Sequence, residues 1–270
     1  MSNSCAICVC VYKSEQYLPK LLDVVSKTAK MFSSYNIFFA FDNAGDNSRS
    51  LLLDYLDKEP NAKIIPGGRN PNHPRVFNIA QARNNCLSEI RCLTNQPTYF
   101  IMIDANYSVQ TQFRPYILEK HLERSAEWDA LSFNRKPYYD EWALSLGNHK
   151  ISIWHLSDTV RDSYRENMRK ELHDGFSRVG KGNYLSVDSA FCGYGIYKTN
   201  VFINYNYSPF WRPDLLLTSQ QIGSYMKSGM LRMNVASISD CEHRNFHAEA
   251  SIHSGARIMI ANDQLFAPEN

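Results

Sequence analysis

The first hundred residues alternate between apolar runs of strand length and segments in which apolar residues recur at helical spacing. The apolar runs cover residues 6–11, 35–41, 62–65 and 99–103, and the helical patterns cover 15–29, 49–56 and 76–93. Ser14 is the expected N-cap of the first helix. Strands that alternate with helices predict a mostly parallel sheet with right-handed crossovers. This alternation therefore predicts an α/β fold.

The second half of the chain is less regular. Helical patterns cover residues 113–126, 158–172 and 245–254, whereas 130–134, 231–238 and 256–260 are strand candidates. A glycine-containing segment occupies 185–196. Nothing in the sequence resembles a flexible linker between the halves. We therefore expect a single compact domain with two lobes, residues 1–107 and 108–270.

Charge and composition exclude several classes of protein. The chain has 29 basic and 27 acidic residues with no block of like charges, so no nucleic-acid partner is expected. No apolar run approaches the roughly 18 residues of a membrane span, and the N-terminus lacks a signal-peptide pattern. The 7 cysteines are scattered and odd in number, which favours reduced thiols in a cytoplasmic location. Cys5 and Cys8 have CxxC spacing within a probable strand and are interpreted as core residues.

The most informative single segment is the end of the fourth apolar run, where Ile103 is followed by Asp104, Ala105 and Asn106. Residues i and i+2 of an extended segment point to the same side. Asp104 and Asn106 can therefore present two oxygen atoms together at the carboxyl end of a strand, where open α/β sheets bind ligands. Mg²⁺ and Mn²⁺ prefer such ligands. The alternative interpretation is an Asx turn after a strand.

Other polar residues also fall at expected strand ends or helix starts. Tyr12 follows the first strand, and Asp42 and Asp46 follow the second. Arg75 and Arg83 lie at the start of the 76–93 helix and within it. The acidic residues are candidates for a base or ribose, and the arginines for a diphosphate. A Walker A sequence and a GxGxxG fingerprint are both missing from the sequence, so neither of those phosphate-binding modes is expected.

Taken in order, these segments resemble the GT-A superfamily of nucleotide-sugar-dependent glycosyltransferases. The segments that carry the resemblance are residues 11–13, 42–48, 75–84, 103–106 and 188–198. Residues 240–247, with the sequence DCEHRNFH, are similar to a segment of mannosyltransferase-like and virus-encoded members. The resemblance implies a Rossmann-like sheet flanked by helices. It also implies that residues 1–107 bind the nucleotide sugar and residues 108–270 bind the acceptor.

The implied activity is sugar transfer from a UDP- or GDP-sugar to a glycan or another hydroxyl acceptor. A divalent metal, Mn²⁺ or Mg²⁺, would stabilise the diphosphate leaving group. Asp104, Asn106 and His243 are the implied metal ligands, and Asp104 would also contact the donor. The usual final Asp of the DxD motif is Asn106 here, and an amide oxygen binds a divalent cation more weakly than a carboxylate does.

An inverting reaction also needs a general base, because the acceptor hydroxyl must lose its proton. Glu242, Asp188 and Asp240 are the candidates. Glu242 is preferred as the base and Asp188 as a ligand of a sugar hydroxyl, whereas a retaining reaction needs no such base. All 4 tryptophans lie in the second half. They are candidates for an acceptor groove, with ordinary packing as the alternative.

Two other functions stay open. The first is a degenerate GT-A domain that binds a nucleotide sugar or glycan without catalysis, and it is motivated by Asn106. The second is a sugar-phosphate nucleotidyltransferase on a similar scaffold. That class needs a Gly-rich, Lys-containing loop after the first strand, which residues 12–16 do not supply. A virus-encoded enzyme would act in the host cytoplasm.

Overall fold

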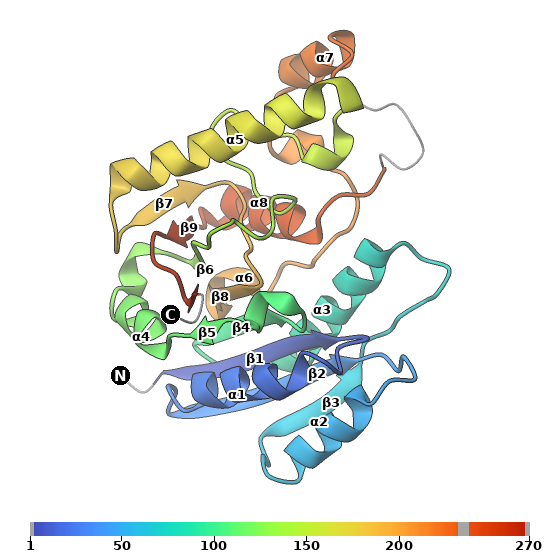
Figure 1. Ribbon diagram of the computed structural model, residues 1–270, viewed down its shortest axis with the longest axis vertical. Coiled ribbons are helices and arrows are strands. Elements are labelled where there is room, and N and C mark those ends of the chain that lie inside the picture. The colour runs from blue at the N-terminus through green and yellow to red at the C-terminus, as the bar shows by residue number, and fades with distance from the viewer. Residues whose placement is uncertain (1–2, 232–237, 268–270) are drawn as a thin grey trace.

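One eight-stranded sheet runs through the molecule in the order β3-β2-β1-β4-β8-β6-β9-β7 (Figure 1). The computed structural model describes residues 3–231 and 238–267. The strands of this sheet are β1 (Ser4–Val11), β2 (Ser34–Phe41), β3 (Ala62–Pro66), β4 (Tyr99–Asp104), β6 (Ala130–Phe133), β7 (Tyr184–Val187), β8 (Tyr194–Lys198) and β9 (Ile258–Ala261). A separate antiparallel pair joins β5 (Gln112–Phe113) to β10 (Phe266–Ala267).

The longer helices lie on both faces of the sheet and beyond its β7 edge (Figure 1). They are α1 (Leu18–Ala29), α2 (Ser48–Leu56), α3 (Arg75–Arg91), α4 (Pro115–Glu123), α5 (Asp158–Val179), α6 (Thr199–Phe202), α7 (Ser219–Lys227) and α8 (Glu242–Ser254). Four short 3₁₀ turns are described: η1 (Tyr107–Val109), η2 (Ser125–Glu127), η3 (Ile153–His155) and η4 (Pro213–Leu215). None of the helices in the described ranges is long and apolar enough to cross a membrane.

The strand pairings confirm the predicted mixed, mostly parallel α/β sheet. Strands β3, β2, β1 and β4 are parallel, and so is the pair β6–β9. The pairs β4–β8, β6–β8 and β7–β9 are antiparallel. Since β4 pairs with both β1 and β8, the two halves of the chain share one continuous sheet. The register places Cys10 opposite Asp104, so β1 and β4 end at the same edge.

Strand β1 is buried on both faces, which explains why its sequence is apolar throughout. Ala6 and Cys8 belong to the hydrophobic cluster that includes α3, and Ile7 and Val9 belong to the cluster that includes α1. This separation follows from the alternation of side chains along a strand. Full burial of each large aliphatic side chain contributes about 1.5–3 kcal/mol. The two-sided core therefore fixes β1 and β4, which carry the first polar residues of the site.

Several boundaries differ from the sequence-based expectations. Helix α1 begins at Leu18 and not at residue 15, because the Ser14 carbonyl accepts hydrogen bonds from the N–H groups of Tyr17 and Leu18 and forms a turn. Ser14 is therefore not the N-cap. Helix α5 continues to Val179 and ends at Gly180, whose φ of 74° is accessible to glycine. Residues 232–237 of the expected 231–238 strand lie outside the described residues.

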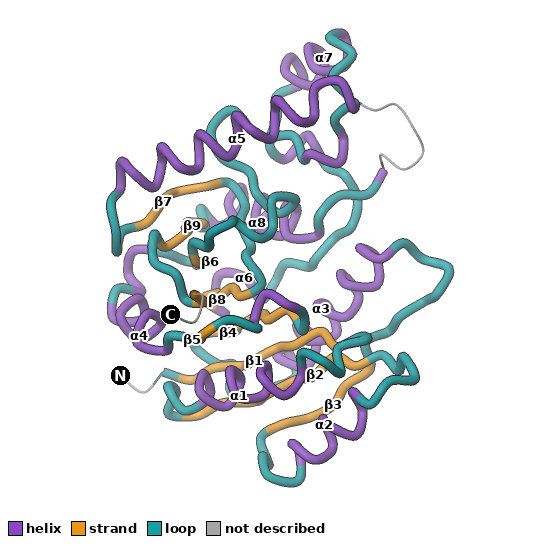
Figure 2. Tube along the Cα trace, viewed as in Figure 1, coloured by secondary structure: helices purple, strands orange, loops and turns teal. Residues whose placement is uncertain are grey.

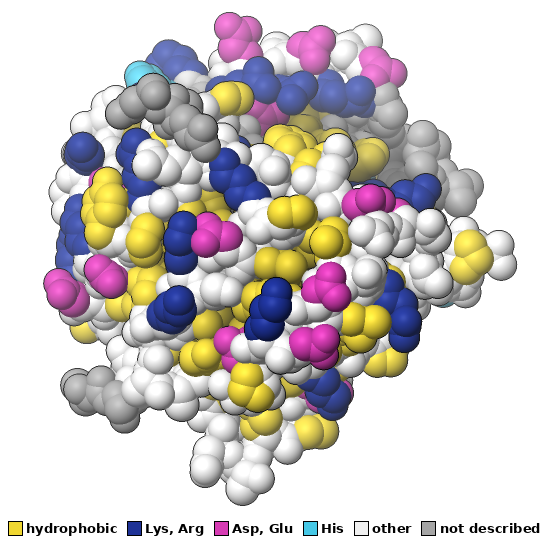
Figure 3. All heavy atoms as spheres, turned by 60° about the horizontal axis from the view of Figure 1, so that its bottom comes forward, with side chains coloured by type: hydrophobic (Ala, Val, Ile, Leu, Met, Phe, Trp, Pro, Cys, Tyr) yellow, Lys and Arg dark blue, Asp and Glu magenta, His cyan; other side chains and the backbone are white. Residues whose placement is uncertain are grey.

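Long connections surround the carboxyl-terminal lobe. Residues 134–157, between β6 and α5, are loop except for η3, and a second long connection joins α6 to α7 (Figure 2). On the face in Figure 3, basic and acidic side chains are interspersed among hydrophobic and uncharged ones. The 7 cysteines are free thiols, in agreement with the absence of a disulfide framework from the sequence pattern.

Candidate active site

The centre of the candidate site is a buried arginine between two carboxylates. Arg83 Nη2 donates a hydrogen bond to Asp104 Oδ1 at 2.9 Å, and Arg83 Nε forms an ion pair with Glu242 Oε1 at 3.0 Å. The guanidinium also lies over the rings of Phe191, 4.6 Å away, and Tyr207, 5.5 Å away. These contacts bring together helix α3, the end of β4, the start of α8 and two loops. The side chain of Arg83 is only 4% exposed, so its charge is neutralised by the protein itself.

Asp104 and Asn106 meet at the end of β4, as their spacing predicts. Asn106 Nδ2 donates to Asp104 Oδ2 at 3.3 Å and to the Tyr139 hydroxyl at 2.7 Å. The Tyr139 hydroxyl also donates to Asp104 Oδ2, at 3.3 Å. Asn106 Oδ1 accepts a hydrogen bond from the Ser108 N–H at 2.8 Å and caps η1. The side-chain amide of Asn106 therefore forms an Asx turn, which was the alternative interpretation of this segment, and its nitrogen points toward Asp104.

Glu242 and His243 begin helix α8 behind Arg83. Burial raises the pKa of the Glu242 carboxyl, and the Arg83 charge opposes that shift. His243 is fully buried, with its ring stacked on Phe191 at 3.9 Å. Its Nε2 lies 3.8 Å from Glu242 Oε1 and has no hydrogen-bond partner. Burial lowers the pKa of His243 well below its ordinary value, so the imidazole is neutral.

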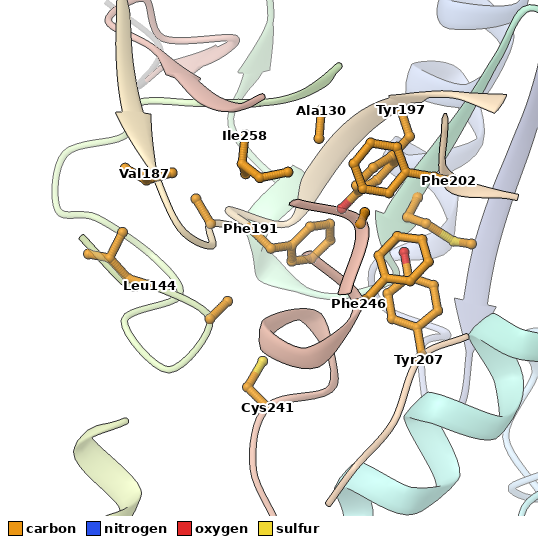
Figure 4. Close-up of a cluster of buried hydrophobic side chains, with 14 of the residues drawn as sticks. Ala130, Leu144, Val187, Phe191, Tyr197, Phe202, Tyr207, Cys241, Phe246 and Ile258 are labelled. Atoms are coloured by element: carbon orange, nitrogen blue, oxygen red, sulfur yellow. The ribbon is translucent and has the colours of Figure 1, made fainter. Parts of the chain in front are cut away.

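Aromatic rings hold this part of the site in place. The rings of Phe246 and Tyr207 lie against each other, with centroids 4.1 Å apart (Figure 4). Asn84 clamps the backbone of Tyr207 from α3, because its Oδ1 accepts from the Tyr207 N–H and its Nδ2 donates to the Tyr207 carbonyl. Phe191 projects from the loop before β8 toward the same cluster (Figure 4). Helices α3 and α8 are thereby fixed relative to each other around Arg83.

A third carboxylate, on Asp140, interacts electrostatically with Asp104 and Glu242 and was missed by the sequence reasoning. Asp140 is half-buried in the loop between β6 and α5, and its Oδ1 accepts the N–H groups of Trp142 and Ala143, both at 3.2 Å. Burial raises its pKa to about 7, with further contributions from the negative charges of Asp104 and Glu242. An isolated Asp in an irregular loop gave no sequence signal for this environment.

At the other end of the site, three strands of the amino-terminal half bring a second group of side chains together. The guanidinium of Arg69 lies 4.0 Å from the ring centre of Tyr12, and its backbone N–H donates to Asp42 Oδ1 at 3.0 Å. Asp42 also packs against Gly67, where an added Cβ would lie 2.2 Å from the carboxylate. Tyr12 and Asp42 were expected here, whereas Arg69 was not, because it lies in a Gly- and Pro-rich loop without periodicity.

The remaining candidates from the sequence are Asp46, Asp188 and Arg75, and the contacts described for them are with residues other than Arg83. Asp46 accepts hydrogen bonds from the Ser48 hydroxyl and the Glu15 N–H, which together with the Ser48 N–H lower its pKa despite the opposing effect of burial. Asp188 pairs with Lys150 at 2.5 Å. Arg75 is exposed at the start of α3, and its charge is one of the smaller effects that oppose the burial-driven rise in the pKa of Glu242.

The fit of a divalent metal depends on the available donors. Asp104 Oδ2 and Asn106 Oδ1 are hard oxygen atoms that can bind such a metal. Two carboxylates contact the buried Arg83, and the charge of Asp140 also acts on them, so the local charge favours a cation. Within the described ranges, no group of three or more His, Cys, Asp or Glu side chains has the arrangement of a metal site. Glu242 lies between His243 and Arg83, and Arg83 in turn contacts Asp104. Two side chains therefore separate His243 from Asp104.

Several solved structures are similar to the chain at low sequence identity. TarS residues 1–349 of S. aureus, in complex with UDP, is 15% identical with a TM-score of 0.49, over 99% of this chain and 61% of that chain. The mannosyltransferase PcManGT of Pyrobaculum calidifontis, in complex with GDP-Man and Mn²⁺, is 11% identical with a TM-score of 0.48, over 99% and 56%. Glucosyl-3-phosphoglycerate synthase of Mycobacterium tuberculosis, in complex with Mn²⁺ and UDP-glucose, is 9% identical with a TM-score of 0.45, over 99% and 72%.

The chain thus spans less than two thirds of the first two of these proteins. A comparison with curated proteins found no match. A sequence model described as Glycosyl transferase family 2 matches residues 6–159, which is more than half of the chain and covers β1 to the start of α5. This match includes Asp104, Asn106 and Asp140. The chain belongs to glycosyl transferase family 2.

Proposed function

We propose that the protein transfers a sugar from a nucleoside diphosphate sugar, a UDP- or GDP-sugar, to a hydroxyl group of an acceptor. The observation that carries this proposal is the pairing of Arg83 with Asp104 and Glu242, at the edge where the parallel strands β1 and β4 end. The Asp140 carboxyl interacts electrostatically with the same two carboxylates. Ligands of α/β sheets bind at this edge. Membership of the family supports the same reaction class.

The amino-terminal half, residues 1–107, is assigned to the donor. Tyr12, Arg69 and Asp42 converge from the ends or following loops of three adjacent strands and offer an aromatic face, a cation and a carboxylate. That combination suits a nucleoside, with the base against the ring and a ribose hydroxyl or base N–H donating to Asp42. The exposed Arg75 is available to the diphosphate, whereas Arg83 is already engaged by two carboxylates.

The second half, residues 108–270, supplies the group that removes the acceptor proton. We assign this role to Asp140, because its half-buried carboxyl interacts electrostatically with Asp104 and Glu242 and has a pKa raised to about 7, near the value that suits a general base. Glu242 is held by Arg83 and Asp188 by Lys150, so both are less available. The acceptor oxygen attacks the anomeric carbon as its proton passes to Asp140, and the sugar–diphosphate bond breaks with its electron pair leaving on the diphosphate.

Asp104 and Asn106 are the proposed ligands for a divalent cation, with Mn²⁺ or Mg²⁺ as candidates. When bound, such a cation would offset the negative charge of the diphosphate. Arg83 holds one oxygen of Asp104 and leaves the other toward Asn106 and Tyr139. In this assignment His243 supports the packing around Glu242 and Phe191 and is not a ligand.

The test is a panel of UDP- and GDP-sugars, with and without Mn²⁺, scored by thermal stabilisation and by release of free sugar from the donor. A ligand that binds only the folded state raises its apparent stability. Stabilisation by one donor, with release of its sugar, supports the enzyme. Stabilisation without release under any condition supports the degenerate binding domain, which is favoured by the replacement of a DxD carboxylate by Asn106. No response to any donor rejects both.

A further inference from the structure

Two tryptophans lie against each other on the surface. The rings of Trp142 and Trp154 have centroids 4.4 Å apart and planes inclined at 37°. Trp142 is 41% exposed and Trp154 is 52% exposed, whereas Trp128 is fully buried. Exposure of one large apolar side chain needs no explanation, but a contiguous pair creates an apolar surface that water solvates poorly. Such a surface is a candidate for ligand binding.

The pair is connected to the candidate site from two directions. The backbone N–H of Trp142 donates a hydrogen bond to Asp140 Oδ1, and Trp142 lies two residues after this proposed base in the sequence. On the other side, Trp154 precedes His155, whose Nε2 lies 3.7 Å from Asp240 Oδ1. Asp240 in turn lies two residues before Glu242. The tryptophan pair is therefore carried by the same loop segments that hold Asp140 and His155, and through them it is connected to the candidate site.

The loop that carries the pair is anchored to the body of the molecule. Glu141, between Asp140 and Trp142, is 8% exposed and forms ion pairs with Arg165 and Arg169 of α5. Near the other end of the loop, the backbone N–H of Trp154 donates a hydrogen bond to the Ser152 hydroxyl, which caps η3. An anchored aromatic surface loses little conformational entropy when it binds a ligand.

We propose that Trp142 and Trp154 form a platform for a sugar ring of the acceptor, which is a neutral oligosaccharide. This inference rests on the proposed function. The C–H groups on one face of a pyranose are slightly positive and pack against the negative face of an indole. Because the pair is carried by the loop that holds Asp140, the ring on the platform would be a neighbour of the sugar that reacts. An acceptor of at least two sugars is therefore required.

The charges near the platform favour a neutral ligand. Asp140 is an acidic residue of the same loop, and Arg165 and Arg169 of α5 are already paired with Glu141. An anionic acceptor would meet the carboxylate cluster without a free partner in these contacts. Hydroxyl groups can instead donate hydrogen bonds to carboxylates.

The experiment uses the full chain and four hexasaccharides as probes: cellohexaose, maltohexaose, chitohexaose and α-1,6-mannohexaose. Acrylamide quenching of tryptophan fluorescence reports whether a probe covers the exposed indoles. At least one probe is expected to reduce quenching and to bind with a dissociation constant that rises tenfold or more in Trp142→Ala and in Trp154→Ala. Trp142→Phe, which keeps an aromatic face, should restore most of the affinity.

Tyr116→Ala is the matched control, since Tyr116 is 58% exposed on α4 and makes no contact with the platform loop in the interactions described. It should leave probe binding unchanged. Donor stabilisation by a nucleotide sugar is measured in parallel. If the wild-type chain binds a donor but no hexasaccharide protects its tryptophans, the platform is rejected while the proposed function stands. Equal loss of probe binding in Tyr116→Ala, or preferential binding to phosphatidylcholine vesicles, also rejects it. No donor binding rejects the proposed function itself.

Discussion

Arg83 Nη2 lies 2.9 Å from Asp104 Oδ1, and this contact joins helix α3 to the end of strand β4 beneath the candidate site. The same guanidinium pairs with Glu242 at 3.0 Å. Arg83 thus compensates two carboxylates that would otherwise be buried without a counter-charge. Its first role is to orient Asp104 so that the second oxygen of that carboxylate is turned toward Asn106.

Replacing Arg83 by methionine should destabilise the fold strongly. Removal of one partner from a buried ion pair leaves an uncompensated charge and costs about 3–5 kcal/mol. Urea unfolding would measure the change. Lys27→Met is the control, because the Lys27–Asp23 pair is about half exposed at 52% and 53% and such pairs contribute about 0–1 kcal/mol. A similar loss of unfolding free energy in both variants would show that the buried ion pair contributes no more to stability than the exposed one.

Asp140→Asn should abolish most of the transfer activity while donor binding persists. Loss of a general base typically lowers the turnover number by about 10²–10⁴-fold. The amide keeps an oxygen for the Trp142 and Ala143 N–H groups, so the loop should stay in place. Steady-state kinetics of Asp140→Asn and Asp188→Asn discriminate the two candidates. A loss confined to Asp188→Asn would assign the role to Asp188, which was one of the candidates from the sequence although Glu242 was preferred.

Asn106→Asp should strengthen metal binding. A carboxylate still accepts the Ser108 N–H, and it adds negative charge beside Asp104. We expect the dissociation constant for Mn²⁺ to fall about tenfold or more, which corresponds to roughly 1.4 kcal/mol. Calorimetry with MnCl₂ measures this. Asn43→Asp is the control, because Asn43 Oδ1 also accepts a nearby N–H, from Gly45, in a different loop. Equal Mn²⁺ affinity of the wild type, Asn106→Asp and Asn43→Asp would mean that the cation binds at a site other than Asn106.

Stability should fall as the pH is lowered from about 6.5, the ordinary pKa of histidine. Burial, reinforced by the charge of Arg83, lowers the pKa of His247 to about 3. Between these values the unfolded chain binds a proton that the folded chain excludes, so acid favours unfolding. The slope reaches about 1.4 kcal/mol per pH unit for one such histidine.

His247→Gln tests this effect, because the amide can still contact Ser189 and Tyr197, the hydrogen-bond partners of the imidazole. Urea unfolding between pH 7 and pH 5 should show a shallower pH dependence in the variant. Parallel curves for the two proteins would mean that His247 does not contribute, and that other groups such as His243 dominate.

The amino-terminal half of the fold was predictable because its signals are local. The apolar runs became β1 to β4, since a strand buried on both faces must be apolar throughout. The proximity of Asp104 and Asn106 also followed from strand geometry, because residues two apart share a side. Helix starts were less predictable, as the Ser14 turn shows, because a hydroxyl side chain can serve either a cap or a turn.

The sequence by itself determined the order of strands and helices in the amino-terminal half, the polar residues at the ends of those strands and the family. Only the tertiary structure decided that Arg83 is enclosed by Asp104 and Glu242, and that His243 lies behind them. It also decided that the charges of Asp104 and Glu242 act on Asp140 and that Trp142 contacts Trp154. The periodicity of a chain specifies which residues face inward, whereas the ionisation and exposure of a side chain depend on distant segments that packing brings beside it.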